Sequence, residues 1–343
     1  MKFRVAIAGC HRMLQPTLAG HNFASAFAAV PETEMVAVYD RSAETRAGFV
    51  RCWGEMPAYD DFGRMLQEVQ PDLLCIATRQ TLHATQIEQA ALTGVLGILC
   101  DKPLATSLQE ADRIISVCRE KGVALAFALD LRWYDSYRHL RRLVAGGIVG
   151  KVTSVLANGC PNLINHGPHW YDAALMLLGD PEPLWVSGWV DDLVNEPADS
   201  RRRLDPPGRG QVGLNNGALL YVTADGGRQR AFEIIGEEGR LLILQDAELC
   251  YLWTESGVEG EPGLRPLLIP SSHDPWPAGP AMVRDLIAAM ASHSTTACDI
   301  EQARRASEIG FAIHLSHLRG GARVTLPAAE RTLSIPSFPW GNE

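Results

Sequence analysis

The residues Cys100-Asp101-Lys102-Pro103 have types and an order that could do chemistry. They follow the apolar run 95–99 and precede residues 104–107, where a helix is expected to begin. If that run is a strand of an open parallel sheet, Lys102 stands at its carboxyl end, where such sheets bind ligands. An ammonium group there can hold or protonate a substrate oxygen, because partial burial lowers the pKa of a lysine toward the working range of an acid or base. The alternative is a lysine that only pairs with Asp101.

The elements that would position this motif alternate between strand and helix over the first third of the chain. Apolar runs predict strands at residues 3–8, 35–39, 73–77, 98–100 and 123–128. Helices are predicted at residues 20–30, 43–53, 62–69, 82–93 and 107–121. The last helix has Ser107 as its N-cap, and Glu110 would complete a capping box. Because the strands are apolar throughout, the alternation predicts a doubly wound parallel sheet with helices on both faces.

The pattern changes in the rest of the chain, where glycines separate a run of short strands. Strands are predicted at residues 151–156, 184–189, 218–223, 231–235, 240–244 and 249–253. Helices are predicted at residues 136–145, 169–178, 281–292 and 300–318. This order predicts an α+β domain with an open, mainly antiparallel sheet. We place the two domains at residues 1–128 and 129–343, with a boundary between Phe127 and Val149, and one late helix can pack back on the first domain.

The start of the chain has the setting of a dinucleotide site, because a first strand ends in glycine and a helix follows. The usual glycine-rich loop lets backbone amides approach a pyrophosphate. Here Gly9 is present, but His11 and Leu14 stand where the second and third glycines are expected. Arg12 can compensate for the missing glycines with its charge.

Asp40 at the end of the second predicted strand bears on the choice of nucleotide. A carboxylate there binds the hydroxyls of the adenosine ribose and repels a ribose phosphate, so NAD is favoured over NADP. Arg41 and Ser42 follow directly and can accommodate that phosphate, so NADP stays an alternative. The other interpretation of Asp40 is a turn residue that only caps the helix at 43–53.

The composition indicates an ordinary globular chain of two domains, with 343 residues, 46% hydrophobic and 21% charged. The net charge of −9 argues against a broad nucleic-acid surface, and the one basic run is Arg201–Arg203. No apolar stretch of about 18 residues is present, so no membrane span is expected. The eight cysteines form no CxxC pair and no metal-like spacing with histidine. We therefore expect reduced thiols, no bound metal and a cytoplasmic protein.

Four stretches together resemble the glucose–fructose oxidoreductase and inositol dehydrogenase family, also written Gfo/Idh/MocA. They are residues 36–42, residues 71–78 leading to Leu82-His83, residues 99–105, and Arg132-Trp133 with the turn at 146–152. In the third, Asp101-Lys102-Pro103 is similar to the family's Glu-Lys-Pro motif. The resemblance spans most of residues 1–160, and residues 165–172 are compatible with it. It implies an N-terminal Rossmann domain and a C-terminal domain whose open sheet commonly forms a subunit interface, giving a homodimer or homotetramer.

The resemblance also implies reversible hydride transfer between a nicotinamide and a secondary alcohol of a sugar, polyol or cyclitol. Lys102 would polarise the reacting oxygen, and His169 would move the hydroxyl proton. Histidine titrates nearest neutrality, and a neighbouring ammonium stabilises developing alkoxide charge. The residues expected at the cofactor are Gly9, His11, Arg12, Asp40, Arg41, Thr78, His83, Asp101 and Lys102.

The expected substrate side differs from the family at one position. Many relatives have aspartate where this chain has Asn165, which can bond a substrate hydroxyl but cannot accept its proton. Asp172, one helical turn after His169, can orient its ring or simply favour the helix N-terminus. The residues expected near the substrate are Arg132, Trp133, His166, Trp170 and Asp172, whose aromatic members either stack on a sugar or pack in the core. His166 and His169 have metal-ligand spacing, but without a third ligand we favour a sugar pocket.

Three functions follow from these residues. The first is an NAD(P)-dependent dehydrogenase or reductase. The second is an enzyme that retains NAD and uses transient oxidation for elimination or glycoside cleavage. The third is a non-catalytic ligand-binding protein, suggested by the altered glycine loop. The presence of both Lys102 and His169 argues against the third.

Overall fold

The computed structural model describes residues 2–192, 194, 197, 204–225, 229–254, 263–270, 272 and 274–336. The chain forms two compact units. Unit 1 consists of Met1–Trp133 and Ser272–Ala303, and unit 2 of Tyr134–Ser271 and Arg304–Glu343. The first division falls after Trp133, within the range 127–149 given above for the boundary. The segment Ser272–Ala303 is part of unit 1.

Unit 1 is built on a six-stranded sheet in the order β3-β2-β1-β4-β5-β6. Its strands are β1 Phe3–Ala8, β2 Thr33–Tyr39, β3 Ala58–Tyr59, β4 Leu73–Ile76, β5 Gly97–Cys100 and β6 Ala124–Phe127. All neighbouring pairs run parallel. The predicted Rossmann-like sheet is confirmed, and the carboxyl ends of its strands meet at one edge, where such sheets bind ligands.

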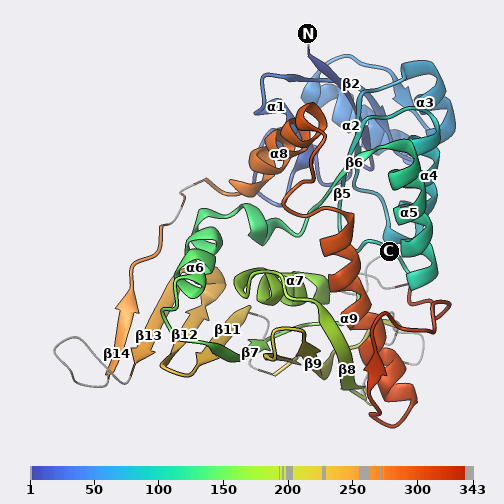
Figure 1. Ribbon diagram of the computed structural model, residues 1–343. Helices are drawn as coiled ribbons and strands as arrows, with labels where there is room; N and C mark the ends of the chain where they lie inside the picture. The colour runs from blue at the N-terminus through green and yellow to red at the C-terminus, as the bar shows by residue number, and fades with distance from the viewer. Residues whose placement is uncertain are drawn as a thin grey trace. The chain divides into compact units, whose positions relative to one another are not determined.

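Helices cover both faces of this sheet. They are α1 Phe23–Ala28, α2 Ala43–Trp53, α3 Phe62–Val69, α4 Gln80–Leu92, α5 Leu108–Lys121, the short η1 Asp130–Trp133 and α8 Ala278–Ser292. Figure 1 shows α4 and α5 on one side of the strands and α1 and α8 on the other. Ser107 caps α5 by accepting a hydrogen bond from the Glu110 N–H at 3.1 Å. The Glu110 carboxylate binds Thr106 instead of Ser107, so the predicted capping box is displaced by one residue.

Unit 2 contains a nine-stranded sheet in the order β14-β13-β12-β11-β7-β10-β9-β8-β15. Its strands are β7 Val152–Asn158, β8 Pro183–Val190, β9 Gly208–Leu214, β10 Leu219–Thr223, β11 Ala231–Gly236, β12 Gly239–Leu244, β13 Leu249–Thr254, β14 Gly263–Leu267 and β15 Val324–Thr325. The pair β7–β10 is parallel, and the other seven pairs are antiparallel. The prediction of a mainly antiparallel sheet is confirmed, although β9, β14 and β15, like β3 of unit 1, were not predicted.

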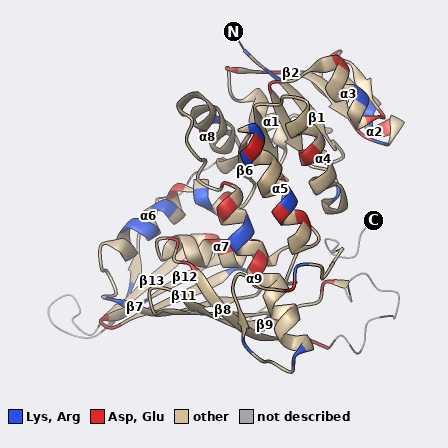
Figure 2. Cartoon of the chain, turned by 45° about the vertical axis from the view of Figure 1, so that its right-hand side comes forward, with Lys and Arg blue, Asp and Glu red and all other residues tan. Residues whose placement is uncertain are grey.

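Two helices of unit 2, α6 Asp135–Ala145 and α7 Gly167–Leu177, lie on one face of this sheet (Figure 1). A third, α9 Ile300–Leu318, begins in unit 1 and continues into unit 2. Figure 2 shows basic segments on α6, and the sequence of that helix includes Arg141. Its guanidinium pairs with Asp180, just after α7, at 3.1 Å. This ion pair ties the two helices together. The basic run Arg201–Arg203 lies outside the described residues.

Two general expectations can be compared with the described residues. No helix among them is long and apolar enough to cross a membrane. None of the eight cysteines forms a disulfide within the described residues, and all but Cys52 are buried. Burial, with the nearby Asp40 carboxylate, raises the pKa of the Cys10 thiol to about 12, so that thiol stays protonated.

Candidate cofactor and catalytic sites

Gly9 directly follows β1 and has a φ of +82°. A Cβ added there would lie 2.6 Å from the carbonyl oxygen of Ala77, the residue that follows β4. The Gly9 N–H donates to the Tyr39 carbonyl at the end of β2, at 2.8 Å. Both the conformation and the space therefore require glycine. This is the tight turn that the first glycine of a dinucleotide-binding loop supplies.

The loop between Gly9 and α1 is held by side chains in place of further glycines. The bonds run from Trp53 Nε1 to the Met13 carbonyl (2.7 Å), from Asn22 Nδ2 to the Gln15 carbonyl (2.7 Å) and from Ser25 Oγ to the Thr17 carbonyl (2.8 Å). His11 and Leu14, which replace the expected glycines, have exposed side chains. Neither side chain is therefore packed inside the loop, and the loop is ordered without glycine.

Asp40 connects the end of β2 to this loop. Its Oδ2 accepts the Cys10 N–H at 3.1 Å, and its Oδ1 accepts the Ser42 N–H at 3.0 Å. The Arg46 guanidinium donates to the Asp40 carbonyl at 2.6 Å, while Arg41 is exposed. Each carboxylate oxygen has two lone pairs, so these bonds leave acceptor capacity for ribose hydroxyls. The same two bonds also fit the alternative interpretation of Asp40 as a turn residue, so a role at the ribose stays a prediction.

An ion pair joins the ends of β1 and β5. The Arg12 guanidinium, 6.0 Å from the centre of the Phe23 ring, pairs with Asp101 Oδ2. The Lys102 N–H donates to Asp101 Oδ1 at 2.8 Å, and the Lys102–Pro103 peptide is cis. Burial alone would raise the pKa of the Asp101 carboxyl, but the charges of Arg12 and Lys102 outweigh burial and hold that pKa below its usual value. Asp101 therefore stays ionised beside Lys102.

Thr78 and His83 connect the ends of β4 and β5. The Thr78 hydroxyl donates to Gln86 Oε1 at 2.5 Å. The two ring nitrogens of His83 face the carbonyl oxygens of Pro103 (2.8 Å) and Thr78 (3.2 Å). His83 is fully buried, and burial lowers the pKa of its imidazole. His83 therefore ties the backbone that follows β4 to the backbone that follows β5.

Arg132 and Trp133 belong to η1 of unit 1 and are 5% and 3% exposed. The Trp133 indole N–H donates to Asp285 Oδ2 on α8 at 3.0 Å. This contact is one of several between α8 and the rest of unit 1, and it favours a packing role for Trp133 over stacking on a sugar.

In unit 2 the histidines lie on a turn and on the helix that follows it. Residues 163–166 form the turn, α7 begins at Gly167, and His169 is in its first turn. The His169 N–H donates to the His166 carbonyl at 2.9 Å. The His166 N–H donates to the buried Asn162 Oδ1 at 2.7 Å. Both histidines are half-buried, which is suitable for groups that exchange protons with a ligand.

Asp205 anchors the same turn, 40 or more positions along the chain. It accepts three backbone hydrogen bonds, from Leu163 (3.1 Å) and Ile164 (2.9 Å) to Oδ1 and from Asn165 (2.8 Å) to Oδ2. The side chain is 3% exposed. The sequence analysis missed Asp205 because nothing in its local sequence marks it, and the contact joins distant parts of the chain.

The other residues expected near the substrate are more deeply buried. Asn165 is 2% exposed and Asp172 is 1% exposed. Trp170 donates its indole N–H to the Asn158 carbonyl at 2.7 Å, and the Arg230 guanidinium lies 5.5 Å from the centre of a Trp170 ring. Trp170 therefore packs within unit 2. The orientation of the His169 ring by Asp172 stays a prediction.

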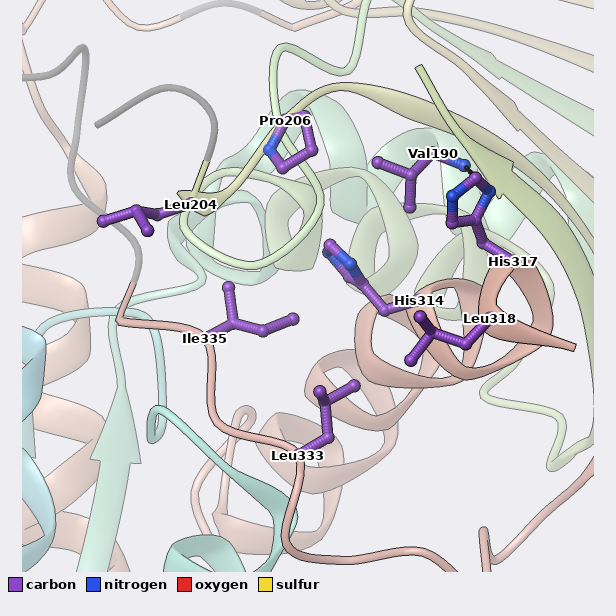
Figure 3. Close-up of a pocket in the computed structure, with 8 residues that line it drawn as sticks. All are labelled: Val190, Leu204, Pro206, His314, His317, Leu318, Leu333 and Ile335. Atoms are coloured by element: carbon purple, nitrogen blue, oxygen red, sulfur yellow. Dashed lines mark hydrogen bonds between the residues drawn. The ribbon is translucent and has the colours of Figure 1, made fainter. Parts of the chain in front are cut away.

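A cavity of about 210 Å³ lies elsewhere in unit 2. Its walls are mostly apolar and come from Val190, Leu204, Pro206, His314, His317, Leu318, Leu333 and Ile335 (Figure 3). No predicted site residue lines it. The His314 Nε2 atom is buried and has no hydrogen-bond partner in the described part of the chain. Burial, and then the nearby His317, lowers the pKa of the His314 imidazole to about 4.

Neutral His314 is expected to make stability depend on pH. An unfolded histidine takes up a proton near pH 6.5, while folded His314 does so only near pH 4. The free energy of unfolding should therefore be highest above pH 6.5. It should fall by at most about 3 kcal/mol as the pH drops from 6.5 to 4. Urea unfolding of wild type and His314→Gln between pH 4 and 7 measures the difference. His139→Gln on α6 is the control. Equal pH slopes for wild type and His314→Gln would contradict the prediction.

Comparison with known proteins relates residues 3–129 of unit 1 to a known family. Residues 3–129 match GFO_IDH_MocA, described as an oxidoreductase family with an NAD-binding Rossmann fold. The chain is 29% identical over 149 residues to D-apiose dehydrogenase of Paraburkholderia graminis, covering 43% of this chain and 38% of that enzyme. It is 26% identical over 197 residues to D-glucoside 3-dehydrogenase of Escherichia coli, covering 52% of this chain and 54% of that enzyme. These matches span about half or less of the relatives' length.

The fold extends beyond the part that matches in sequence. A solved structure of levoglucosan dehydrogenase with NADH and levoglucosan superposes with a TM-score of 0.80. The superposition covers 95% of this chain and all of the other, at 18% identity. At that identity the likeness shows a shared fold. The N-terminal part of the chain, residues 3–129, therefore matches the Gfo/Idh/MocA oxidoreductase family, and the shared fold extends over 95% of the chain.

Proposed function

We propose that the protein is an NAD(P)-dependent oxidoreductase. It would transfer a hydride between the nicotinamide and a secondary alcohol or ketone of a sugar, polyol or cyclitol. The observation that carries the proposal is the cluster of Gly9, Asp40 and Lys102 at the ends of β1, β2 and β5, at the ligand-binding edge of a parallel sheet. The names of the relatives above support a carbohydrate as the substrate.

The residues of unit 1 fit a dinucleotide. Gly9 supplies the tight turn, and Asp40 supplies a carboxylate with acceptor capacity for ribose hydroxyls, which favours NAD. Arg12 places a cation in the loop where a diphosphate would bind. Gln80 begins α4 at the same edge, and its buried Nε2 atom has no hydrogen-bond partner within the described residues. A polar ligand would satisfy that donor.

The chemistry divides between two side chains. The bound nicotinamide would supply the acceptor or donor of the hydride. The Lys102 ammonium holds the reacting oxygen and stabilises the negative charge that develops on it. The His169 imidazole accepts the hydroxyl proton during oxidation and returns it during reduction. Asn165 is confined to hydrogen bonding, since an amide does not accept a proton near neutrality.

Removing the Arg12 charge is expected to weaken dinucleotide binding. Arg12→Gln should raise the Kd for NAD by about 10-fold, the size of one lost charge-assisted hydrogen bond. Fluorescence titration at two salt concentrations measures this, and the variant should show the weaker salt dependence. Arg113→Gln on α5, which breaks the Arg113–Glu88 pair at the surface of unit 1, is the control. An unchanged Kd would restrict Arg12 to holding Asp101.

Native mass spectrometry of the freshly purified protein, followed by separate addition of NAD and NADP, tests the proposed function. An empty protein that takes up NAD in preference, and then reduces it with a member of an aldose, polyol and cyclitol panel, supports a dehydrogenase. Nicotinamide that survives purification without net turnover supports the retained-cofactor enzyme instead. Binding of neither nucleotide at millimolar concentration would overturn both and favour a ligand-binding protein.

A further inference from the structure

We propose that Asp205 is a positioning residue for His169: its buried carboxylate fixes the turn from which α7 starts, and thereby the place of the imidazole. The inference rests on the proposed function in one respect, that His169 moves the substrate proton. Both oxygens of Asp205 are engaged with the backbone of residues 163–165. Asn162 binds the next N–H, so four consecutive backbone donors end on two buried side chains.

The turn transmits its position directly to the helix. His169 lies three residues past His166 and bonds to its carbonyl, so the first turn of α7 follows the backbone at His166. The Tyr171 hydroxyl donates to the Leu163 carbonyl at 3.2 Å. A Cβ on Gly167 would lie 2.5 Å from that hydroxyl oxygen, so the start of the helix packs tightly on the turn. A displaced turn therefore cannot be absorbed before His169.

The chain on either side of Asp205 is held separately. Leu204 and Pro206 line the apolar cavity together with Ile335 and His314 (Figure 3). The neighbouring side chains thus face this cavity, while the carboxylate itself is buried against the turn. Asp205 therefore lies between two residues that line the cavity, and its own carboxylate binds the polar backbone of the turn. This arrangement fits an anchor for the turn.

The hydrogen-bonding capacity of the side chain at position 205 predicts the order of kcat among its variants. Asp205→Asn replaces one acceptor oxygen with an NH2 donor, which would face a backbone N–H. Asp205→Ala removes both acceptors. Asp205→Glu keeps both oxygens on a side chain one methylene longer, so partial rescue is expected. The expected order of kcat is wild type, then Glu, then Asn and Ala.

The test measures kcat and KM with the panel member that wild type oxidises fastest, together with the Kd for NAD. Asp205→Asn should lower kcat by roughly 10- to 100-fold, the size that misplacement of a reacting group by about 1 Å produces. The Kd for NAD should not change, because the nucleotide residues belong to unit 1. Glu308→Gln is the matched control, since Glu308 is a buried carboxylate of unit 2 that binds Arg304 and the Ala328 N–H. Wild-type kcat in Asp205→Asn, or an equal loss in Glu308→Gln, would overturn the proposal.

Hydrogen exchange tests the role of Asp205 without a measurement of activity, so its result does not depend on the proposed function. If wild type oxidises nothing in the panel, the proposed function fails, and exchange of the amides at 163–166 decides on the anchor. Faster exchange there in Asp205→Asn, with no change in Glu308→Gln, supports it. Unchanged exchange in Asp205→Asn would reject it.

Discussion

Lys102→Met is expected to lower kcat for sugar oxidation by about 10³-fold, with the Kd for NAD close to the wild-type value. Methionine has a similar length but carries no charge. The lost ammonium would otherwise stabilise the negative charge on the reacting oxygen, and removal of one such donor costs about 10²- to 10³-fold in kcat. Steady-state kinetics with the best member of the sugar and polyol panel, combined with NAD titration, separates the two effects.

Two further variants test whether the loss of kcat in Lys102→Met is specific to position 102 or follows from any lysine-to-methionine change. Lys121→Met makes the same change at the end of α5, where Lys121 pairs with Glu120, and kcat should be unchanged. Lys102→Arg keeps the charge on a longer, planar group, so it should recover only part of kcat. If Lys102→Met kept more than about a tenth of kcat, Lys102 would be left with the structural role beside Asp101 that the sequence also allowed.

The first unit could be predicted closely because its signals are local. Apolar runs ended by turn residues identified the five main strands, and Ser107 marked the start of α5. The same residue types carried the resemblance that proved correct for residues 3–129. The missed strand β3 has two residues, too few for any period to show.

The missed strand β9 has a physical explanation. Its sequence contains Gly208, Gly210 and Gly213, and glycine normally indicates a break in a strand. In the structure a Cβ at Gly210 would lie 2.8 Å from Ile313 on α9, and one at Gly213 would lie 2.1 Å from the Trp185 ring. The glycines are there because large neighbours occupy the space. That reason lies in the tertiary structure and cannot be read from the segment itself.

The candidate site could be predicted only as residue types. Lys102, Asp40 and His169 were identified because each has a chemical reason at its predicted place. The pairing of Arg12 with Asp101 and the bonds of Asp205 to the 163–165 turn join parts of the chain 89 and about 40 residues apart. No spacing rule marks such contacts. The sequence therefore predicts which groups would do the chemistry, and the structure adds the contacts that hold Asp101 and the 163–165 turn.

His169→Gln is expected to lower kcat by about 10²- to 10⁴-fold, the usual contribution of a general acid–base group. Glutamine keeps hydrogen-bonding capacity but cannot take the hydroxyl proton. The pH dependence gives the direction of the effect. Oxidation requires the neutral imidazole, so wild-type kcat should rise with pH as the ring loses its proton, and reduction should show the opposite slope. The variant should lose both slopes, because the titrating group is gone.

The control for this variant is His139→Gln on α6, which removes another imidazole of unit 2. Its kcat and pH profile should match the wild type. Added imidazole should restore part of kcat in His169→Gln, since a free base can accept the proton in the space left by the ring. Structural damage would not respond to imidazole, and it would lower the free energy of unfolding together with kcat. A variant that kept the wild-type pH profile would show that another group, with His166 the nearest candidate, accepts the proton.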